Sequence, residues 1–172
     1  MADVKKGIIL KGIGGLYFVE TADAVFECKA RGIFRKSGQK PLVGDEVDIL
    51  IGEDGANNTI EKIYPRRSEL MRPPVSNLDR LFILSSVRDP NPSTLIIDKM
   101  TAIACWKNIE PVIVITKDDL GDTSELRDIY EKAGIPFFSV SSRDGRGADE
   151  VKAMLSGHIS AFAGNTGVGK SS

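Results

Sequence analysis

The sequence has very few of the residues that build metal clusters or disulfide frameworks. Its 172 residues include two cysteines, Cys28 and Cys105, and one histidine, His158. Their spacing fits no zinc-binding pattern, and both cysteines stand in apolar stretches, so we expect reduced thiols in or near the core of an intracellular protein. An excess of one charge is also missing, because 24 acidic residues oppose 23 basic ones. The net charge therefore indicates no polyanionic partner, and any such partner must be bound locally.

Long apolar runs are missing as well. The longest ones, at 81–84 and 112–115, are far too short to cross a bilayer. Residues 1–6 lack the apolar stretch and the small-residue cleavage site of a signal peptide. We therefore expect a cytoplasmic protein without a membrane partner.

Glycine, by contrast, is frequent in the first part of the chain, where it separates short strand-like segments. We expect strands at 7–11, 15–21, 24–34, 45–51 and 59–64. Five short strands suit a small closed barrel, so residues 1–66 are predicted to form an all-β OB-fold. Prolines and arginines are concentrated at 65–74, and this composition disfavours regular structure. We therefore predict a linker at 67–77.

The rest of the chain alternates between strand-like and helix-like segments. Strands are predicted at 80–86, 112–116, 137–140 and 159–163, and helices at 94–107, 124–133 and 148–155. Apolar strands joined by helices imply a parallel sheet with covered faces, so residues 78–172 are predicted to form an α/β domain. Ligands of such sheets bind beyond the carboxyl ends of the strands. In the first helix, we expect Ile96, Met100, Ile103 and Trp106 to pack in the core.

A phosphate-binding motif follows the last predicted strand. Residues 164–171 match the P-loop pattern G-x-x-x-x-G-K-[ST]. Its glycines allow backbone N–H groups to converge on phosphates, Lys170 would neutralise phosphate charge, and the Ser171 hydroxyl would bind Mg²⁺. The predicted nucleotide contacts here are Gly164, Asn165, Thr166, Gly167, Val168, Gly169, Lys170, Ser171 and Ser172.

Two base-recognition motifs stand at the ends of other predicted strands. Residues 116–119 match [NT]-K-x-D, in which the Asp119 carboxylate would accept hydrogen bonds from guanine N1–H and the N2 amine. Adenine has no donor at either place, so the motif favours guanine. Lys117 would lie along the base and reach P-loop carbonyls. Ser141 and Ser142 begin a loop like the one from which GTPases donate a backbone N–H to guanine O6. Thr116 stands where GTPases generally have Asn, and we expect it to hold the P-loop less firmly.

The order of these motifs is reversed relative to ordinary small GTPases, because the base motifs precede the P-loop. A sheet tolerates such a circular permutation when its old termini lie close in space. Further matching segments are Cys28-Lys29-Ala30-Arg31-Gly32, Phe34-Arg35-Lys36, Pro41-Leu42-Val43-Gly44-Asp45, Arg72-Pro73 and Asn77-Leu78-Asp79. With these segments and motifs, the whole chain resembles the bacterial ribosome small-subunit-dependent GTPase A family (RsgA). The expected fold is an OB barrel followed by a circularly permuted, incomplete P-loop GTPase domain with a parallel sheet.

The resemblance implies a monomeric GTPase that uses Mg²⁺ with GTP or GDP late in the maturation of the small ribosomal subunit. It also implies that the OB domain contacts ribosomal RNA. Positions 29–40 contain five basic residues and no acid, which suits phosphate contacts, although a solvated loop would have the same composition. The predicted RNA contacts are Lys29, Arg31, Arg35, Lys36 and Lys40.

The sequence ends one residue after the P-loop serine, so we expect a truncated chain. The switch threonine, the D-x-P-G aspartate and the zinc-binding Cys and His cluster that the resemblance implies would all follow Ser172. Apart from the charge of Lys170, no catalytic residue is predicted, and we expect little turnover. Two alternatives stay open: an ATP-using P-loop enzyme, and a module that binds RNA and GTP without catalysis.

Overall fold

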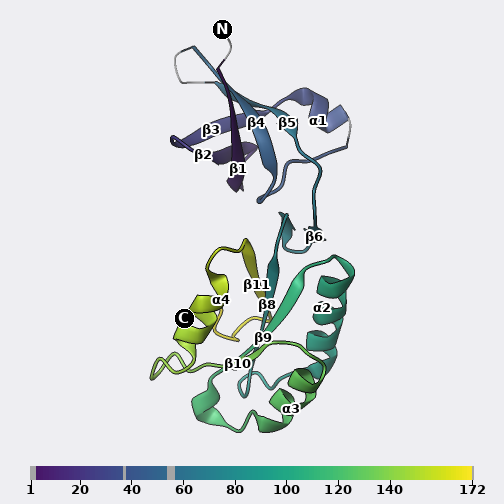
Figure 1. Ribbon diagram of the computed structural model, residues 1–172, viewed down its shortest axis with the longest axis vertical. Helices are drawn as coiled ribbons and strands as arrows, with labels where there is room; N and C mark the ends of the chain where they lie inside the picture. The colour runs from purple at the N-terminus through teal and green to yellow at the C-terminus, as the bar shows by residue number, and fades with distance from the viewer. Residues whose placement is uncertain (1–2, 37, 54–56, 172) are drawn as a thin grey trace. The chain divides into compact units, whose positions relative to one another are not determined.

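Residues 3–36, 38–53 and 57–171 are described by a computed structural model of the chain, except for the side chains of Arg35 and Lys36. They form two compact units, Met1–Asn77 and Leu78–Ser172 (Figure 1). We call them the barrel unit and the sheet unit, and each is described by itself. None of the helices in the described ranges combines the length and the apolar character needed to cross a bilayer.

The barrel unit is a closed barrel with the strand order β1-β2-β3-β5-β4. Its strands are β1 (Asp3–Ile13), β2 (Leu16–Thr21), β3 (Val25–Ala30), β4 (Glu46–Ile51) and β5 (Asn58–Ile63). Only the pairing of β3 with β5 is parallel among these neighbours. The predicted five-stranded OB-like barrel is therefore confirmed.

Alternate residues of the strands fill the barrel, including the fully buried Val19, Val47 and Ile49. Cys28 lies in this core, and burial raises the pKa of its thiol to about 11, so the thiol stays protonated at neutral pH. Cys105, in contrast, is exposed, and the expectation of a thiol in or near the core is wrong there.

The third strand is shorter than predicted. It ends at Ala30, and Gly32–Lys36 form the helix α1 instead of continuing to residue 34. The physical reason is packing: α1 places Phe34 in the barrel core, beside the inward-facing residues of the strands. Phe34 thus continues the alternating apolar pattern of the sequence beyond Ala30, where the strand ends, and this explains why the predicted strand was too long.

Residues 67–77 belong to the barrel unit and carry two short strands, β6 (Glu69–Met71) and β7 (Pro74–Ser76). They pair as an antiparallel hairpin. The expectation that this segment lacks regular structure is therefore wrong. Pro73 stands between the strands and Pro74 begins β7, where a missing N–H donor is tolerated.

A buried ion pair attaches this segment to the barrel. The Asp45 carboxylate is fully buried and accepts hydrogen bonds from Arg66 Nε and Nη2 at 2.7 and 2.8 Å. Ser76 Oγ and Leu42 N donate to the same carboxylate at 2.6 and 2.8 Å. The carboxylate raises the pKa of the Arg66 guanidinium, which stays charged. Barrel and hairpin are thus held together by one satisfied polar network.

The sheet unit has four parallel strands in the order β10-β9-β8-β11. They are β8 (Arg80–Ser86), β9 (Glu110–Thr116), β10 (Phe137–Ser139) and β11 (Ser160–Gly164), with the helices α2 (Thr94–Trp106), α3 (Ser124–Lys132) and α4 (Ala148–Leu155) and the 3-10 turn η1 (Asp118–Leu120). Figure 1 shows α4 on the opposite side of the sheet from α2 and α3. The predicted α/β architecture is confirmed, and the carboxyl ends of its strands share one edge.

The buried face of α2 differs from the predicted one. Ile97, Thr101 and Ala104 face the core, whereas Ile103 is 48% and Trp106 77% exposed. Because apolar residues surround this helix on more than one side, their spacing did not define a single face. The buried positions of α2 are therefore shifted by one residue from the predicted ones, which corresponds to a rotation of the helix about its own axis.

Breaking the pair of Arg66 and Asp45 should destabilise the barrel unit strongly. Arg66→Met leaves a buried carboxylate without its counter-ion, which we expect to lower the free energy of unfolding by about 3–5 kcal/mol. The control is Arg31→Met. This change breaks the pair of Arg31 with Glu61, in which the Arg31 side chain is 56% exposed. That change should cost about 1 kcal/mol or less.

Pulsed alkylation of Cys28 in a urea series measures the opening of the barrel alone, because this thiol lies in the barrel core. Equal losses of stability in the two variants would contradict the role given to Asp45.

Candidate nucleotide-binding site

The P-loop begins where β11 ends, at the carboxyl edge of the sheet. Gly164 lies against β8, and a Cβ at this position would stand 2.4 Å from the backbone oxygen of Leu84. Gly167 and Gly169 have φ angles of 82° and 81°. Residues with a Cβ rarely adopt such positive φ angles, whereas glycine does so readily. The glycines of the motif are therefore required by the local backbone itself.

Val168 anchors the P-loop from within. Its side chain is 1% exposed and belongs to the core cluster with Phe82, Leu84, Val112 and Val114. A predicted nucleotide contact of this residue can therefore come only from its backbone, while the side chain fixes the loop to the sheet.

The charged end of the loop is exposed. Lys170 Nζ donates to the backbone oxygens of Gly164 and Asn165 at 3.0 and 2.6 Å. Asn165, Thr166 and Ser171 are also exposed, and Ser172 lies outside the described residues. An incoming phosphate must therefore exchange with the carbonyl acceptors of Lys170.

Thr116 joins the first base motif to the P-loop. Its hydroxyl lies 2.7 Å from the backbone oxygen of Val168 and 3.2 Å from that of Ser85. A hydroxyl has one proton, so it donates to one of these oxygens at a time, and the P-loop oxygen is the nearer. A threonine at this position thus reaches the P-loop directly.

Lys117 reaches a different partner from the one expected. Its backbone is left-handed, with φ of 57°, and its Nζ donates to the backbone oxygen of Asp89 rather than to the P-loop. Ser86 Oγ likewise donates to the backbone oxygen of Pro90 at 2.6 Å. The segment after β8 therefore takes part in the site, although sequence reasoning missed it. Its run of Asp89, two prolines and Asn91 at a strand end could have indicated it.

The two base motifs meet at Asp119. Ser141 Oγ donates to Asp119 Oδ1 at 3.1 Å, and Arg143 Nη1 lies 3.9 Å from Oδ2. Ser141 is buried, whereas the Asp119 side chain is 21% exposed, so a ligand can still approach the carboxylate. Ser142 is exposed in the following loop.

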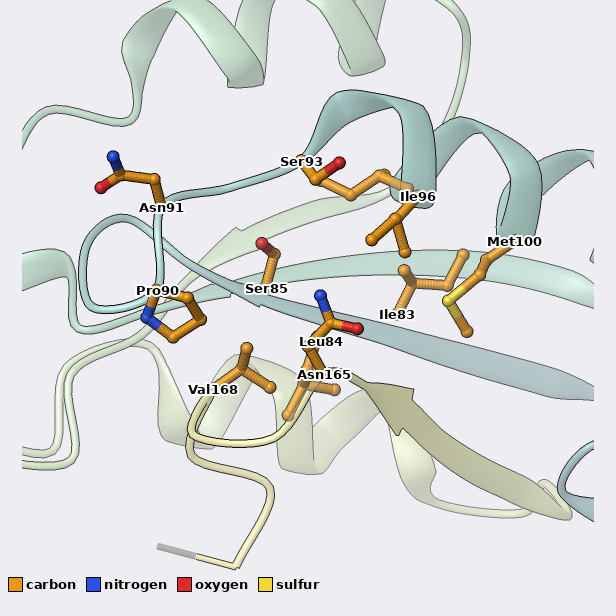
Figure 2. A pocket seen from close by; sticks show the side chains of 11 residues that line it. Ile83, Leu84, Ser85, Pro90, Asn91, Ser93, Ile96, Met100, Asn165 and Val168 are labelled. Atoms are coloured by element: carbon orange, nitrogen blue, oxygen red, sulfur yellow. The ribbon is translucent and has the colours of Figure 1, made fainter.

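A narrow hollow separates the P-loop from α2 and the segment after β8. Asn165 and Val168 line it from the P-loop, Pro90 and Asn91 from the segment after β8, and Ile96 from α2 (Figure 2). Its volume of about 10 Å³ is at most that of a single water site. It is a packing defect beside the pocket, not a further ligand site.

The predicted RNA contacts lie on the barrel unit. Lys29 and Lys40 are exposed, whereas the Arg31 guanidinium is paired with Glu61. Lys29 borders a hollow of about 380 Å³ with Phe26, and Lys40 borders one of about 430 Å³ with Tyr17. The side chains of Arg35 and Lys36 lie outside the described part of the chain.

Comparison with known proteins finds relatives of both units. The family described as RsgA GTPase matches residues 63–172, and the one described as RsgA N-terminal domain matches residues 6–57. A protein named small ribosomal subunit biogenesis GTPase RsgA from Alkaliphilus metalliredigens is 42% identical over 98% of this chain and 59% of its own length. Its namesake from Ruminiclostridium cellulolyticum is 44% identical over 96% of this chain and 56% of its own length.

Two solved structures share the fold. The crystal structure of YjeQ from Thermotoga maritima has a TM-score of 0.83 and 34% identity, covering 98% of this chain and 63% of its own. The structure of YloQ, described as a circularly permuted GTPase, has a TM-score of 0.81 and 30% identity, covering 97% and 62%. The chain thus spans less than two thirds of the length of each of these relatives.

Removing the Thr116 hydroxyl should loosen the P-loop. Thr116→Val keeps the shape of the side chain but deprives the Val168 oxygen of its donor, so we expect nucleotide affinity to fall about tenfold. Thr116→Ser should restore it. Titration with a fluorescent guanine nucleotide measures the change.

Thr101→Val is the matched control, because the buried Thr101 hydroxyl has no hydrogen-bond partner among the described residues. Its affinity should equal that of the unchanged protein. If Thr116→Val also binds as tightly, the hydroxyl does not hold the loop.

Proposed function

The chain belongs to the RsgA GTPase family, and from this premise we propose that it binds GTP and GDP with Mg²⁺ in a guanine-specific pocket. The full protein hydrolyses GTP during late maturation of the small ribosomal subunit. It works in the cytoplasm as a monomer, with the barrel unit against ribosomal RNA. Relatives named small ribosomal subunit biogenesis GTPases support this proposal.

The observation that carries the proposal is the convergence of three motifs at one sheet edge. The hydrogen bond between Thr116 and Val168 joins the first base motif to the P-loop. The hydrogen bond between Ser141 and Asp119 joins the first base motif to the second base motif. The predicted phosphate-binding and base-binding motifs thus share the carboxyl edge of the sheet, at the ends of β11, β9 and β10, and a doubly wound sheet binds its ligand at this edge.

Guanine selectivity comes from the Asp119 carboxylate. Guanine N1–H and the N2 amine donate to its two oxygens, and the backbone N–H of Ser142 donates to O6. Adenine would leave the carboxylate without a donor, which rejects it because unpaired polar groups in a binding site are unfavourable. Lys117 lies along the base.

The phosphates bind to the P-loop. Backbone N–H groups of residues 164–172 surround them, and Lys170 exchanges its carbonyl partners for phosphate oxygens. Ser171 suits Mg²⁺ because its exposed hydroxyl, next to Lys170, is a hard oxygen ligand. One such protein ligand is enough, since Mg²⁺ in phosphate sites is held mainly by phosphate oxygens and water. When bound, the ion neutralises charge on the phosphate oxygens.

Hydrolysis depends on placing a water in line with the γ-phosphate and on stabilising charge. Lys170 provides charge, but none of the three motifs supplies a group among the described residues that would orient the water, so we propose little turnover for these residues alone. The described residues contain no group of three or more His, Cys, Asp or Glu arranged to hold a metal. The described residues therefore lack the ligand set of the zinc site that the family resemblance implies, and the proposed mechanism uses no zinc.

Contact with RNA is assigned to the exposed basic residues of the barrel. Lys29, Arg31 and Lys40, with Arg35 and Lys36 between them, provide charge for phosphate contacts. Because few aromatic residues stand among these positions, recognition of RNA by shape and phosphate contacts suits this surface better than base stacking.

Replacing Asp119 should change the base that the pocket prefers. Asp119→Asn presents an amide donor, which suits the C2 carbonyl of xanthine, so GDP binding should weaken at least about tenfold and XDP binding should strengthen. Competition against a fluorescent nucleotide measures both. Asp128→Asn, the same change on the exposed face of α3, should alter neither, and an unchanged preference in Asp119→Asn would remove Asp119 from the pocket.

Replacing the five basic residues by alanine should weaken binding to small ribosomal subunits. Each lost phosphate contact should also reduce the slope of log affinity against log salt by about 0.7–0.9. Sedimentation with purified subunits over a salt series measures both effects. The control replaces Lys99, Lys107 and Lys132 of the sheet unit. Equal association of both variants at every salt concentration would place the RNA surface elsewhere.

A further inference from the structure

The loop that joins β10 to α4 contacts the first base motif at more than one point. One contact is the hydrogen bond from Ser141 Oγ to Asp119, and another is the backbone bond from Asp118 N to the Val140 oxygen at 3.1 Å. Both lie where this loop begins. Neither contact involves the outer part of the loop, which carries Ser142, so an attachment of that part must come from other residues.

Arg146 provides that attachment. Its Nη1 donates to Asp118 Oδ2 at 2.8 Å, across the two loops, and its Nη2 donates to Asp144 Oδ2 at 2.8 Å, within its own loop. Asp118 is the residue next to Asp119, and its side chain is only 15% exposed. One guanidinium therefore bridges carboxylates of both base motifs.

The backbone around Arg146 closes the loop. Ser141 N donates to the Arg146 oxygen at 3.0 Å, and Gly145 N donates to the Ser141 oxygen at 2.9 Å. At Gly147, φ is 74° and a Cβ would stand 2.2 Å from the Ser139 oxygen, so the chain returns sharply to the sheet. Ser142 thus lies in a loop that backbone hydrogen bonds close, and the Arg146 guanidinium connects this loop to Asp118.

Charge gives Arg146 a second effect. Asp118, Asp119 and Asp144 bring three carboxylates into the two loops, and like charges at short range repel. Hydrogen bonds from Arg146 lower the pKa of Asp144, and the carboxylates of Asp144 and Asp118 raise the pKa of Arg146. Arg146 thus compensates Asp118 and Asp144, whereas Asp119 faces Ser141 and Arg143 and keeps 21% of its side chain exposed.

We propose that Arg146 is a positioning residue for base recognition: by binding Asp118 and Asp144 together, it holds the Ser142 N–H and the Asp119 carboxylate toward the same edge of guanine. This inference rests on the proposed guanine site. Sequence reasoning did not single out Arg146, because a charged residue after a glycine in a loop is usually solvated.

The test compares GDP with IDP, whose hypoxanthine base lacks the N2 amine. In Arg146→Ala, Asp119 should be less well placed for that amine, so GDP affinity should fall about tenfold and the preference for GDP over IDP about threefold. Arg146→Lys should restore part of the preference. A merely structural role would weaken both nucleotides equally and leave their ratio unchanged.

Asp118→Asn is the second variant, because it keeps the shape of the side chain and remains usable if Arg146→Ala does not fold. Its preference for GDP over IDP should fall in the same direction, and the double variant should lose little more than Arg146→Ala alone, since both changes weaken the pair of Arg146 and Asp118. Lys152→Ala, at an exposed site on α4, is the control and should change nothing.

The outcomes separate this inference from the proposed function. A GDP-to-IDP ratio that stays constant in Arg146→Ala and Asp118→Asn, while the unchanged protein prefers GDP to ADP, overturns the positioning role alone. An unchanged protein that binds GDP no better than ADP overturns the guanine site and this inference with it.

Discussion

The proposed nucleotide pocket depends on one short hydrogen bond, from the Thr116 hydroxyl to the backbone oxygen of Val168. It connects the end of β9, where we propose that the base binds, to the loop after β11, where we propose that the phosphates bind, across the intervening strand β8. Val168 is in turn fixed by burial in the core of the sheet. The proposed base-binding and phosphate-binding groups are therefore held at a fixed separation by contacts within the protein.

This connection also explains why a reversed motif order is compatible with the site. The strands that carry the motifs are parallel, and their carboxyl ends lie at one edge whatever their order along the chain. What the pocket requires is the spatial order β10-β9-β8-β11, together with tight local backbone at the strand ends. Gly164, which leaves no space for a Cβ against β8, is one such place.

Sequence alone predicted the features that have strict local requirements. Gly167 and Gly169 need left-handed backbone, and the apolar strands need burial on both faces, so both leave clear patterns. It did not predict the partners of long charged side chains. Lys117 binds the Asp89 oxygen, Arg146 bridges two loops and Arg66 binds Asp45, and each of these contacts joins segments that only tertiary structure brings together. Helix α2 shows a further limit, since a helix that is apolar on several sides has no face defined by spacing.

Competition for a bound fluorescent guanine nucleotide, measured with this 172-residue chain, tests the central claim most directly. Because a site built to pair with N1–H and the N2 amine rejects a base without them, GDP should displace the probe at a concentration at least about 100-fold lower than ADP. Displacement by GDP and ADP at equal concentrations would contradict guanine recognition by the loops that meet at Asp119.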